Sequence, residues 1–206
     1  MMNPTTRRAF LAMAAALPAW AVTPLRAQEG ADPRLAEIVL GTAEAPVELI
    51  EYASFTCPHC ARFHGEVLPR LREIYVDQGK LRIVFRSVFR NRYDLWATMV
   101  ARCGETERIQ GLIAEIFRAQ PSWTQGADDA AIAANLQRIG ILAAIPQEKL
   151  AACMGDQAFA NALVKNFMDD PLQKQVEGTP TFFINGEKYG NMAYEEFARV
   201  IDAALD

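Results

Sequence analysis

Two cysteines three positions apart, Cys57 and Cys60, are the residues of this chain best suited by type and spacing to do chemistry. They enclose Pro58 and His59 in a Cys-Pro-His-Cys motif. Thiols at this spacing lie one helical turn apart, so they can form a disulfide that exchanges with other thiols. Because the thiolate is the nucleophilic form, this chemistry depends on what lowers the pKa of one sulfur.

The sequence around the motif places the first sulfur at the start of a helix. Residues 47–53, rich in branched and aromatic side chains, predict a buried strand before the motif. Apolar residues then recur at helical spacing, at Phe63, Val67, Leu71 and Ile74. We therefore expect Cys57 in the N-cap region and Pro58 at the first helical position. Unpaired N–H groups and the helix dipole favour a thiolate there, so Cys57 is the predicted nucleophile and Cys60 the resolving thiol.

His59 adds an imidazole between the two sulfurs. It can donate to the Cys57 thiolate or carry positive charge beside it, which stabilises the reduced form and makes the disulfide more oxidising. A zinc site is an alternative use of the motif, but a closed structural site needs four ligands and usually a second close pair. The other cysteines, Cys103 and Cys153, are distant in sequence from the motif and from each other. A purely structural bridge is also a poor fit, because so short a loop gains little chain entropy.

Length, composition and charge indicate one sizeable domain. The chain has 206 residues, of which 51% are hydrophobic, enough for one core with a large insertion. A formal net charge of −4 makes nucleic acid an unfavoured partner.

The first residues resemble an export signal. Arg7 and Arg8 precede an apolar run that continues to Val22, which is too short to span a membrane comfortably. The arginine pair also resembles a twin-arginine signal, although ordinary secretory signals contain such pairs too. Ala27 offers a cleavage point, so we expect residues 1–27 to be a signal peptide. Export implies an oxidising compartment in which all four cysteines can be paired.

The remaining pattern predicts an α/β fold. The signal peptide (1–27) is followed by a polar arm (28–46) and a βαβ half that contains the motif (47–93). A helical region (94–176) and a ββα half (177–206) complete the chain. The arm has a possible strand at 38–40, and Pro69 is expected to kink or divide the helix after the motif. Strand 81–88 should run parallel to 47–53, since a helix joins them.

The later segments have clear start and stop signals. In the helical region, Asp128 or Asp129 is the expected N-cap of a helix that Gly140 ends. Near the carboxyl end, Asn185-Gly186 predicts a tight hairpin between two strands, followed by an amphipathic helix. The whole is one sheet with helices on both faces and a helical insertion in the crossover.

Two motifs resemble those of the thioredoxin-fold thiol oxidases of the DsbA family, especially its alphaproteobacterial branch. They are the Cys-Pro-His-Cys motif after an apolar strand and the later sequence Gly178 to Gly186. This resemblance covers the chain from about Val47 to its end. It implies a thioredoxin-like fold with a helical insertion and a cis peptide bond at Thr179-Pro180 facing the motif. The backbone of Thr179 would then offer a strand edge to an incoming peptide.

Glu51 matches the acid that this family has beneath the active site. It would relay a proton to or from Cys60, although on the strand pattern alone it could equally point to solvent. We expect His64 to be a surface residue without a role. Cys103 and Cys153 each fall on the apolar stripe of an insertion helix, so they should be joined in an oxidising compartment, the alternative being two separate buried thiols.

Three functions compete. The first is a periplasmic oxidase that donates the Cys57–Cys60 disulfide to reduced, unfolded exported proteins through a mixed disulfide at Cys57. The resemblance implies a DsbB-like membrane reoxidant. We also expect no cofactor besides the redox-active disulfide, and a monomer. The second is an isomerase or reductase of the same fold, but residues 28–46 look too short for the dimerisation region that such isomerases tend to carry. The third is a copper or zinc module using Cys57, His59 and Cys60.

Overall fold

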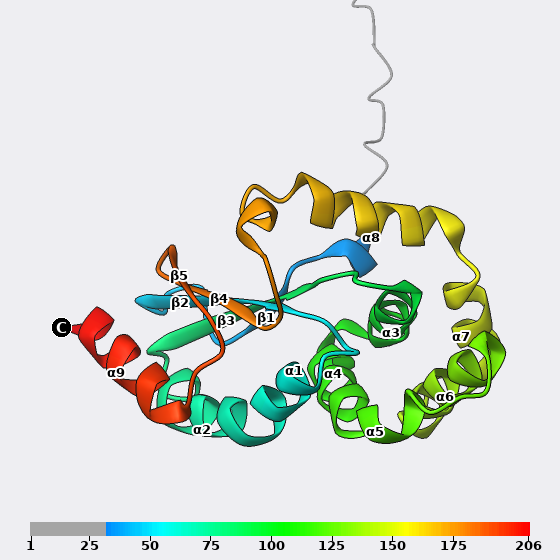
Figure 1. Ribbon diagram of the computed structural model, residues 1–206, viewed down its shortest axis with the longest axis horizontal. Coiled ribbons are helices and arrows are strands. Elements are labelled where there is room, and N and C mark those ends of the chain that lie inside the picture. The colour runs from blue at the N-terminus through cyan, green and yellow to red at the C-terminus, as the bar shows by residue number, and fades with distance from the viewer. Residues whose placement is uncertain (1–31) are drawn as a thin grey trace, which may run out of the picture. The chain divides into compact units, whose positions relative to one another are not determined.

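A five-stranded mixed sheet forms the centre of the structure (Figure 1). The structure is a computed structural model that describes residues 32–206. The expected signal peptide and the first residues of the arm therefore lie outside the described residues. The strands are β1 (Ile38–Leu40), β2 (Val47–Ala53), β3 (Leu81–Ser87), β4 (Thr181–Ile184) and β5 (Glu187–Tyr189).

The strand order is β1-β3-β2-β4-β5, with β2 at the centre. β2 and β3 are parallel, with Val47 opposite Leu81, and this confirms the predicted βαβ unit. β1 is antiparallel to β3, while β4 is antiparallel to β2 and β5 to β4. Asn185 and Gly186 form the hairpin turn with φ angles of 45° and 87°, the left-handed conformation that this residue pair favours.

The helix that carries the motif continues past Pro69 and contains two wider turns, one before and one after that residue. It comprises α1 (Pro58–Arg62), a π-helical segment at Phe63–Val67, α2 (Leu68–Leu71) and a second π-helical segment at Arg72–Val76. The expected apolar stripe fails at its end, because Ile74 is 44% exposed and Tyr75 and Val76 are buried. Wider turns change the angular position of later residues, so a regular 3.6-residue repeat no longer identifies the buried face.

Six α-helices lie between β3 and β4 in the described part of the sequence. They are α3 (Arg92–Arg102), α4 (Ile109–Arg118), α5 (Gln120–Trp123), α6 (Asp129–Leu142), α7 (Gln147–Met154) and α8 (Gln157–Asp169). Asp128 caps α6 through the N–H of Ala131, and Asp156 caps α8.

The prediction that Gly140 ends α6 is wrong. Gly140 is buried inside that helix, which runs to Leu142, and a Cβ atom there would lie 2.6 Å from a methyl carbon of Leu150. The glycine therefore allows α7 to approach closely rather than providing a left-handed cap. The positive φ angle of 62° occurs instead at Ala144, beyond the helix end.

Helices cover both faces of the sheet, as the sequence predicted (Figure 1). α1, α2 and α9 (Tyr194–Leu205) lie along one face, where Leu49 of β2 packs in one buried cluster with Phe63 and Phe197. The end of α8 covers the other face, where Tyr52 and Phe183 pack near Phe167. The fold class, an α/β thioredoxin-like fold with a helical insertion, is therefore confirmed.

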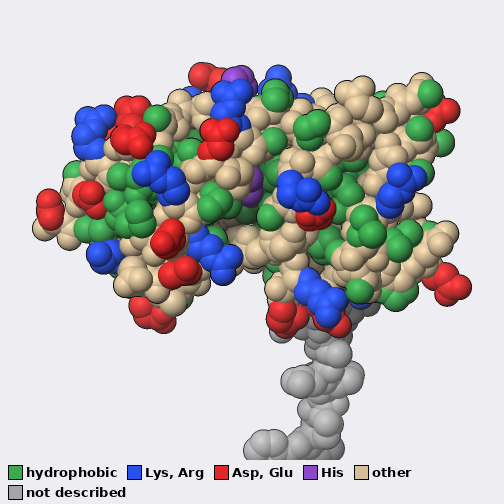
Figure 2. Space-filling model, turned by 90° about the horizontal axis from the view of Figure 1, so that it is seen from below, with side chains coloured by type: hydrophobic (Ala, Val, Ile, Leu, Met, Phe, Trp, Pro, Cys, Tyr) green, Lys and Arg blue, Asp and Glu red, His purple; other side chains and the backbone are tan. Residues whose placement is uncertain are grey.

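The surface has no dominant charge on the face viewed in Figure 2, where basic and acidic side chains are interspersed with small apolar areas. None of the helices in residues 32–206 is both long and apolar enough to cross a membrane.

Candidate active site

Cys57 and Cys60 lie where β2 gives way to α1. Cys57 is the N-cap residue and Pro58 occupies the first turn, as the sequence predicted. The carbonyl of Cys57 accepts from the N–H of Ala61, whereas its side chain makes no capping hydrogen bond. The Cys57 residue is 8% exposed and Cys60 is fully buried, and both are free thiols in this structure. Cys57 is thus the sulfur nearer to the surface.

The two sulfurs have opposite acidities. The pKa of Cys57 is lowered to about 5. The largest cause is a hydrogen bond from Cys60, and hydrogen bonds with Thr179 and with the N–H groups of Cys60 and His59 lower it further. The same hydrogen bond raises the pKa of Cys60 far above its usual value, with burial and the charge of Glu51 acting in the same direction. At neutral pH this arrangement favours a Cys57 thiolate beside a protonated Cys60.

The loop before β4 faces the first sulfur. The Thr179–Pro180 peptide bond is cis, and the carbonyl oxygen of Thr179 lies 3.2 Å from Cys57 Sγ. Thr179 is half-buried and Pro180 is buried, and β4 begins at the next residue. The backbone of Thr179 therefore borders the position that a second sulfur must reach to attack Cys57.

His59 is exposed at the start of α1. Its backbone N–H is among the groups that lower the pKa of Cys57. The contribution expected from its imidazole stays a prediction, because the effect found here belongs to the backbone, which any residue at this position except proline would supply.

Glu51 points into the protein and not to solvent. It is 1% exposed and lies on β2, opposite Phe85 of β3 and Phe182 of β4. Both of its carboxylate oxygens are 3.1 Å from Nε2 of His64. The charge of Glu51 acts on Cys60, where it raises the thiol pKa.

The expectation that His64 is a surface residue is wrong. Its side chain is only 5% exposed, and its ring stacks on Phe117 of α4 with a centroid separation of 4.1 Å. The π-helical turn of Phe63–Val67 carries His64 on the inner side of the helix, so simple helical periodicity from the motif could not place it.

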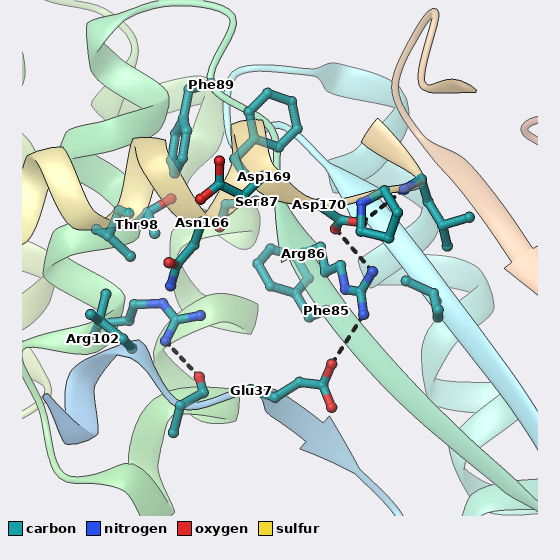
Figure 3. A pocket seen from close by; sticks show the side chains of 17 residues that line it. Glu37, Phe85, Arg86, Ser87, Phe89, Thr98, Arg102, Asn166, Asp169 and Asp170 are labelled. Carbon is teal, nitrogen blue, oxygen red and sulfur yellow. Dashed lines mark hydrogen bonds and ion pairs between the residues drawn. The ribbon is translucent and has the colours of Figure 1, made fainter. Parts of the chain in front are cut away.

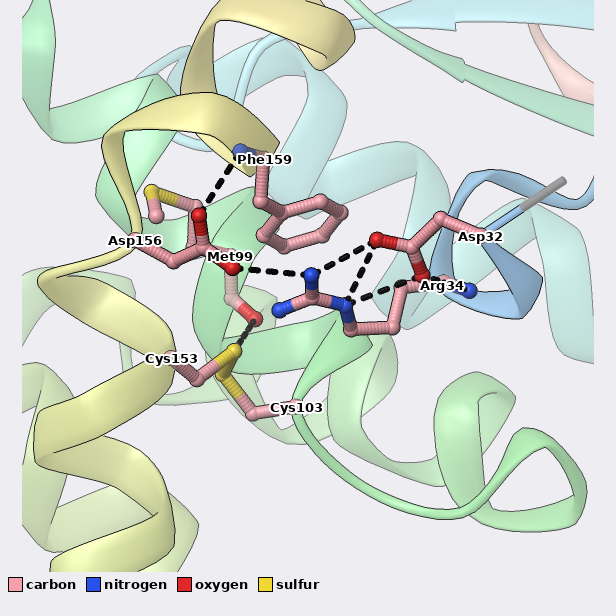
Figure 4. Close-up of a disulfide and its surroundings, with 7 residues drawn as sticks. All are labelled: Asp32, Arg34, Met99, Cys103, Cys153, Asp156 and Phe159. Carbon is pink, nitrogen blue, oxygen red and sulfur yellow. Dashed lines mark hydrogen bonds and ion pairs between the residues drawn. A yellow bond between two sulfur atoms is a disulfide. The ribbon is translucent and has the colours of Figure 1, made fainter. Parts of the chain in front are cut away.

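A disulfide joins Cys103 and Cys153, which are 50 residues apart (Figure 4). It connects the end of α3 to α7, and both residues are buried. Arg34 covers this region: its guanidinium stacks on Phe159 at 4.0 Å and bonds to Asp156 at 2.8 Å. The bridge therefore ties two insertion helices together in a buried and covered place.

A family model described as thioredoxin matches residues 34–203. The chain belongs to the thioredoxin family. The crystal structure of Wolbachia pipientis alpha-DsbA1 superposes with a TM-score of 0.75 at 29% identity, over 83% of this chain and 92% of that one. A Rickettsia conorii protein, named provisionally as a protein-disulfide oxidoreductase, is 32% identical over 82% of this chain and 61% of its own length. These matches confirm the predicted membership of the DsbA branch.

The chain spans about three fifths of the length of the Rickettsia relatives it matches. The crystal structure of a protein-disulfide isomerase from Novosphingobium aromaticivorans aligns with a TM-score of 0.72 at 26% identity, over 82% of this chain and 97% of that one. Oxidoreductase and isomerase names therefore both occur among proteins of this architecture.

Sequence reasoning missed two residues that fix the loop before Cys57. Asp94 of α3 is fully buried and accepts hydrogen bonds from the Ser54 hydroxyl at 2.8 Å and the Thr56 N–H at 2.9 Å. Gln120 of α5 donates its amide to the carbonyl oxygens of Phe55 and Cys57 at 2.7 and 3.0 Å. A polar residue early in a helix is ordinarily exposed, so the sequence offers no signal for these contacts.

A cavity of the described residues lies away from the sulfurs (Figure 3). It has a volume of about 500 Å³ and lies between β3, α3 and α8, with Ser87, Arg102 and Phe167 among its walls. Arg102 donates to the carbonyl oxygens of Arg34 and Ala36, which fastens the arm to α3. We assign the active site by the reactive sulfurs and not by cavity size, because a protein substrate binds along an open edge. Residues 32–206 contain no group of three or more His, Cys, Asp or Glu side chains arranged to hold a metal ion.

Proposed function

We propose that this chain is a thiol:disulfide oxidase that donates the Cys57–Cys60 disulfide to reduced, unfolded proteins. The observation that carries the proposal is the pairing of a low-pKa sulfur near the surface with a buried, high-pKa sulfur, next to the backbone of Thr179. Family membership supports a disulfide oxidoreductase, and the two acidities support the direction of exchange.

The reaction takes two steps. A substrate thiolate attacks Cys57 Sγ, the Cys57–Cys60 bond breaks, and Cys60 leaves as a thiolate that takes up a proton. A second substrate thiolate then attacks the substrate sulfur of the mixed disulfide, and Cys57 leaves as a thiolate. The substrate loses two electrons and forms one disulfide, and the protein gains them as a dithiol.

The direction follows from which state the site stabilises. A pKa of about 5 makes the Cys57 thiolate a good leaving group and stabilises the reduced protein at neutral pH. Breaking the protein's own disulfide is therefore favourable, which is the property of a disulfide donor. In this scheme the edge at Thr179 aligns the substrate chain, and Glu51 exchanges a proton with Cys60.

The oxidase acts in the periplasm as a monomer, after removal of residues 1–27, and a DsbB-like membrane protein reoxidises it. It uses no cofactor besides its own disulfide. An isomerase role is the second candidate function, because the Novosphingobium protein-disulfide isomerase shares this architecture.

The test is to mix the oxidised protein with reduced, unfolded ribonuclease A. We expect two substrate thiols to disappear for each protein disulfide consumed. A Cys60→Ser variant, first converted to its Cys57–glutathione disulfide, should form a substrate adduct on Cys57 and release glutathione. A matched assay offers the reduced protein scrambled ribonuclease. If rearrangement of the scrambled form is fast and oxidation of the reduced form is absent, the isomerase role replaces the oxidase role.

A further inference from the structure

His64 and Glu51 form a buried hydrogen-bonded pair, and the charge of Glu51 acts on Cys60. Both carboxylate oxygens of Glu51 are 3.1 Å from Nε2 of His64. Neither side chain is open to water, at 1% exposure for Glu51 and 5% for His64. A buried carboxylate is costly unless it is hydrogen-bonded, and His64 supplies that hydrogen bond.

Several aromatic rings lie around the pair. The His64 ring stacks on Phe117 of α4 and meets Phe63 and Phe85 edge-on. The strand neighbours of Glu51 are Phe85 of β3 and Phe182 of β4. The titratable groups that these contacts link are Glu51, His64 and, at the start of α1, Cys60 with its partner Cys57.

We propose that His64 is a positioning residue that holds Glu51 ready to accept the proton of Cys60. The imidazole suits this task because one ring nitrogen can donate to a carboxylate in one tautomer and accept from a carboxylic acid in the other. Glu51 thus keeps a hydrogen-bond partner both before and after it takes up the proton. This inference rests on the proposed function, since it concerns how the same two sulfurs exchange.

The step that needs this proton transfer is closure of the disulfide. The Cys57 thiolate attacks glutathione disulfide, a model oxidant, which forms a Cys57–glutathione bond and releases one glutathione thiolate. Cys60 then gives its proton to the Glu51 carboxylate, its thiolate attacks Cys57 Sγ, and the second glutathione leaves as a thiolate. Because Cys60 is the less acidic sulfur, its deprotonation limits closure at neutral pH.

Three variants separate the roles. Glu51→Gln removes the proton acceptor. His64→Phe keeps an aromatic ring beside Phe117 but removes the hydrogen bond that holds the Glu51 carboxylate in place. His64→Gln restores a group that can both donate and accept, and serves as the matched conservative variant.

The experiment follows the glutathione adduct at Cys57 by acid quench and mass spectrometry between pH 6 and 8. We expect closure to slow by about a hundredfold in Glu51→Gln, by about tenfold in His64→Phe and by less than about threefold in His64→Gln. In the wild type the closure rate should change little with pH. In the two impaired variants it should rise about tenfold per pH unit, because hydroxide must then remove the proton.

The outcomes test the role of His64 separately from the proposed oxidase function. If His64→Phe closes at the wild-type rate and with the wild-type pH slope while Glu51→Gln is slow, the role of His64 is overturned. Equal slowing of His64→Phe and His64→Gln without a change in slope would mean a merely structural role, and overturns it too. A wild-type protein that never closes its glutathione adduct overturns the proposed function as well. Iodoacetamide labelling of Cys57 at unchanged rate verifies that each variant has a folded active site.

Discussion

The two cysteine pairs of this chain have the same atoms but opposite surroundings. Cys57 and Cys60 lie three positions apart at the amino end of α1, next to the half-buried Thr179. Cys103 and Cys153 are 50 residues apart, buried between α3 and α7 and covered by the arm (Figure 4). The long loop between Cys103 and Cys153 lets their disulfide stabilise the fold, whereas the helix N-terminus at Cys57 stabilises a thiolate.

Reactivity in this molecule comes from the groups that stabilise the reduced state. Backbone N–H groups and Thr179 support the Cys57 thiolate, and Cys60 donates to it. At the second pair, the polar neighbour is the carbonyl oxygen of Met99, 3.7 Å from Cys153 Sγ. A carbonyl oxygen cannot donate to a thiolate at either pair, so what sets the first pair apart is the donation that Cys57 receives from Cys60 and from backbone N–H groups.

The largest expected effect separates the pairs by function. Cys57→Ser should abolish oxidation of reduced ribonuclease, because Cys57 is the sulfur that forms the mixed disulfide. The matched control, Cys103→Ala with Cys153→Ala, should keep activity within about twofold when assayed where it is folded. The measurement is the loss of substrate thiols with time. Residual activity in Cys57→Ser at about a tenth of the wild-type rate would mean that the second pair also exchanges.

The next effect separates the pairs by stability. Removing both Cys103 and Cys153 should lower the free energy of unfolding by up to about 4 kcal/mol, the chain-entropy value for a loop of this length. The measurement is urea unfolding with the Cys57–Cys60 pair reduced in both proteins. A loss below about 0.5 kcal/mol would show that the bridge does not stabilise the insertion.

The pH dependence sharpens the difference between the sulfurs. Since the folded pKa of Cys57 is lowered to about 5 from about 9, the unfolded chain holds one more proton between these values. Stability of the reduced protein should therefore rise from pH 5 to 9, by at most about 1.4 kcal/mol per unit. Alkylation of Cys57 by iodoacetamide should titrate near pH 5. A midpoint above pH 8 would contradict the assignment of Cys57 as the activated sulfur.

The smallest effect concerns His59. His59→Leu removes the imidazole and leaves the backbone N–H that lowers the Cys57 pKa. We therefore expect the midpoint of Cys57 alkylation to rise by less than about one pH unit. The variant protein should be a correspondingly weaker oxidant. A rise of two units or more would show that the imidazole, and not the helix start, dominates.

The sequence was sufficient for features that depend on local patterns. The strand before the motif, Cys57 as N-cap and the turn at Asn185-Gly186 follow from residues that are adjacent in the chain. The resemblance added the fold, which local patterns alone could not distinguish from other α/β arrangements.

Features that depend on tertiary contacts were beyond the sequence. His64 is buried because a π-helical turn and Phe117 of α4 bring it inside, and Gly140 is required by the approach of Leu150. Asp94 is likewise buried against a loop that precedes it by 38 residues or more. None of these contacts leaves a periodic signal in the chain. The sequence therefore misplaced His64 and Gly140 and gave no indication of the role of Asp94.

The most direct test of disulfide donation compares the stability of two redox states. Urea unfolding at pH 7 should be measured with Cys57–Cys60 oxidised and reduced, while the Cys103–Cys153 bridge stays intact. We predict that the reduced form is the more stable one, because the folded site stabilises the Cys57 thiolate and the short loop gains little from its bond. If the oxidised form is clearly more stable, the pair is not a disulfide donor.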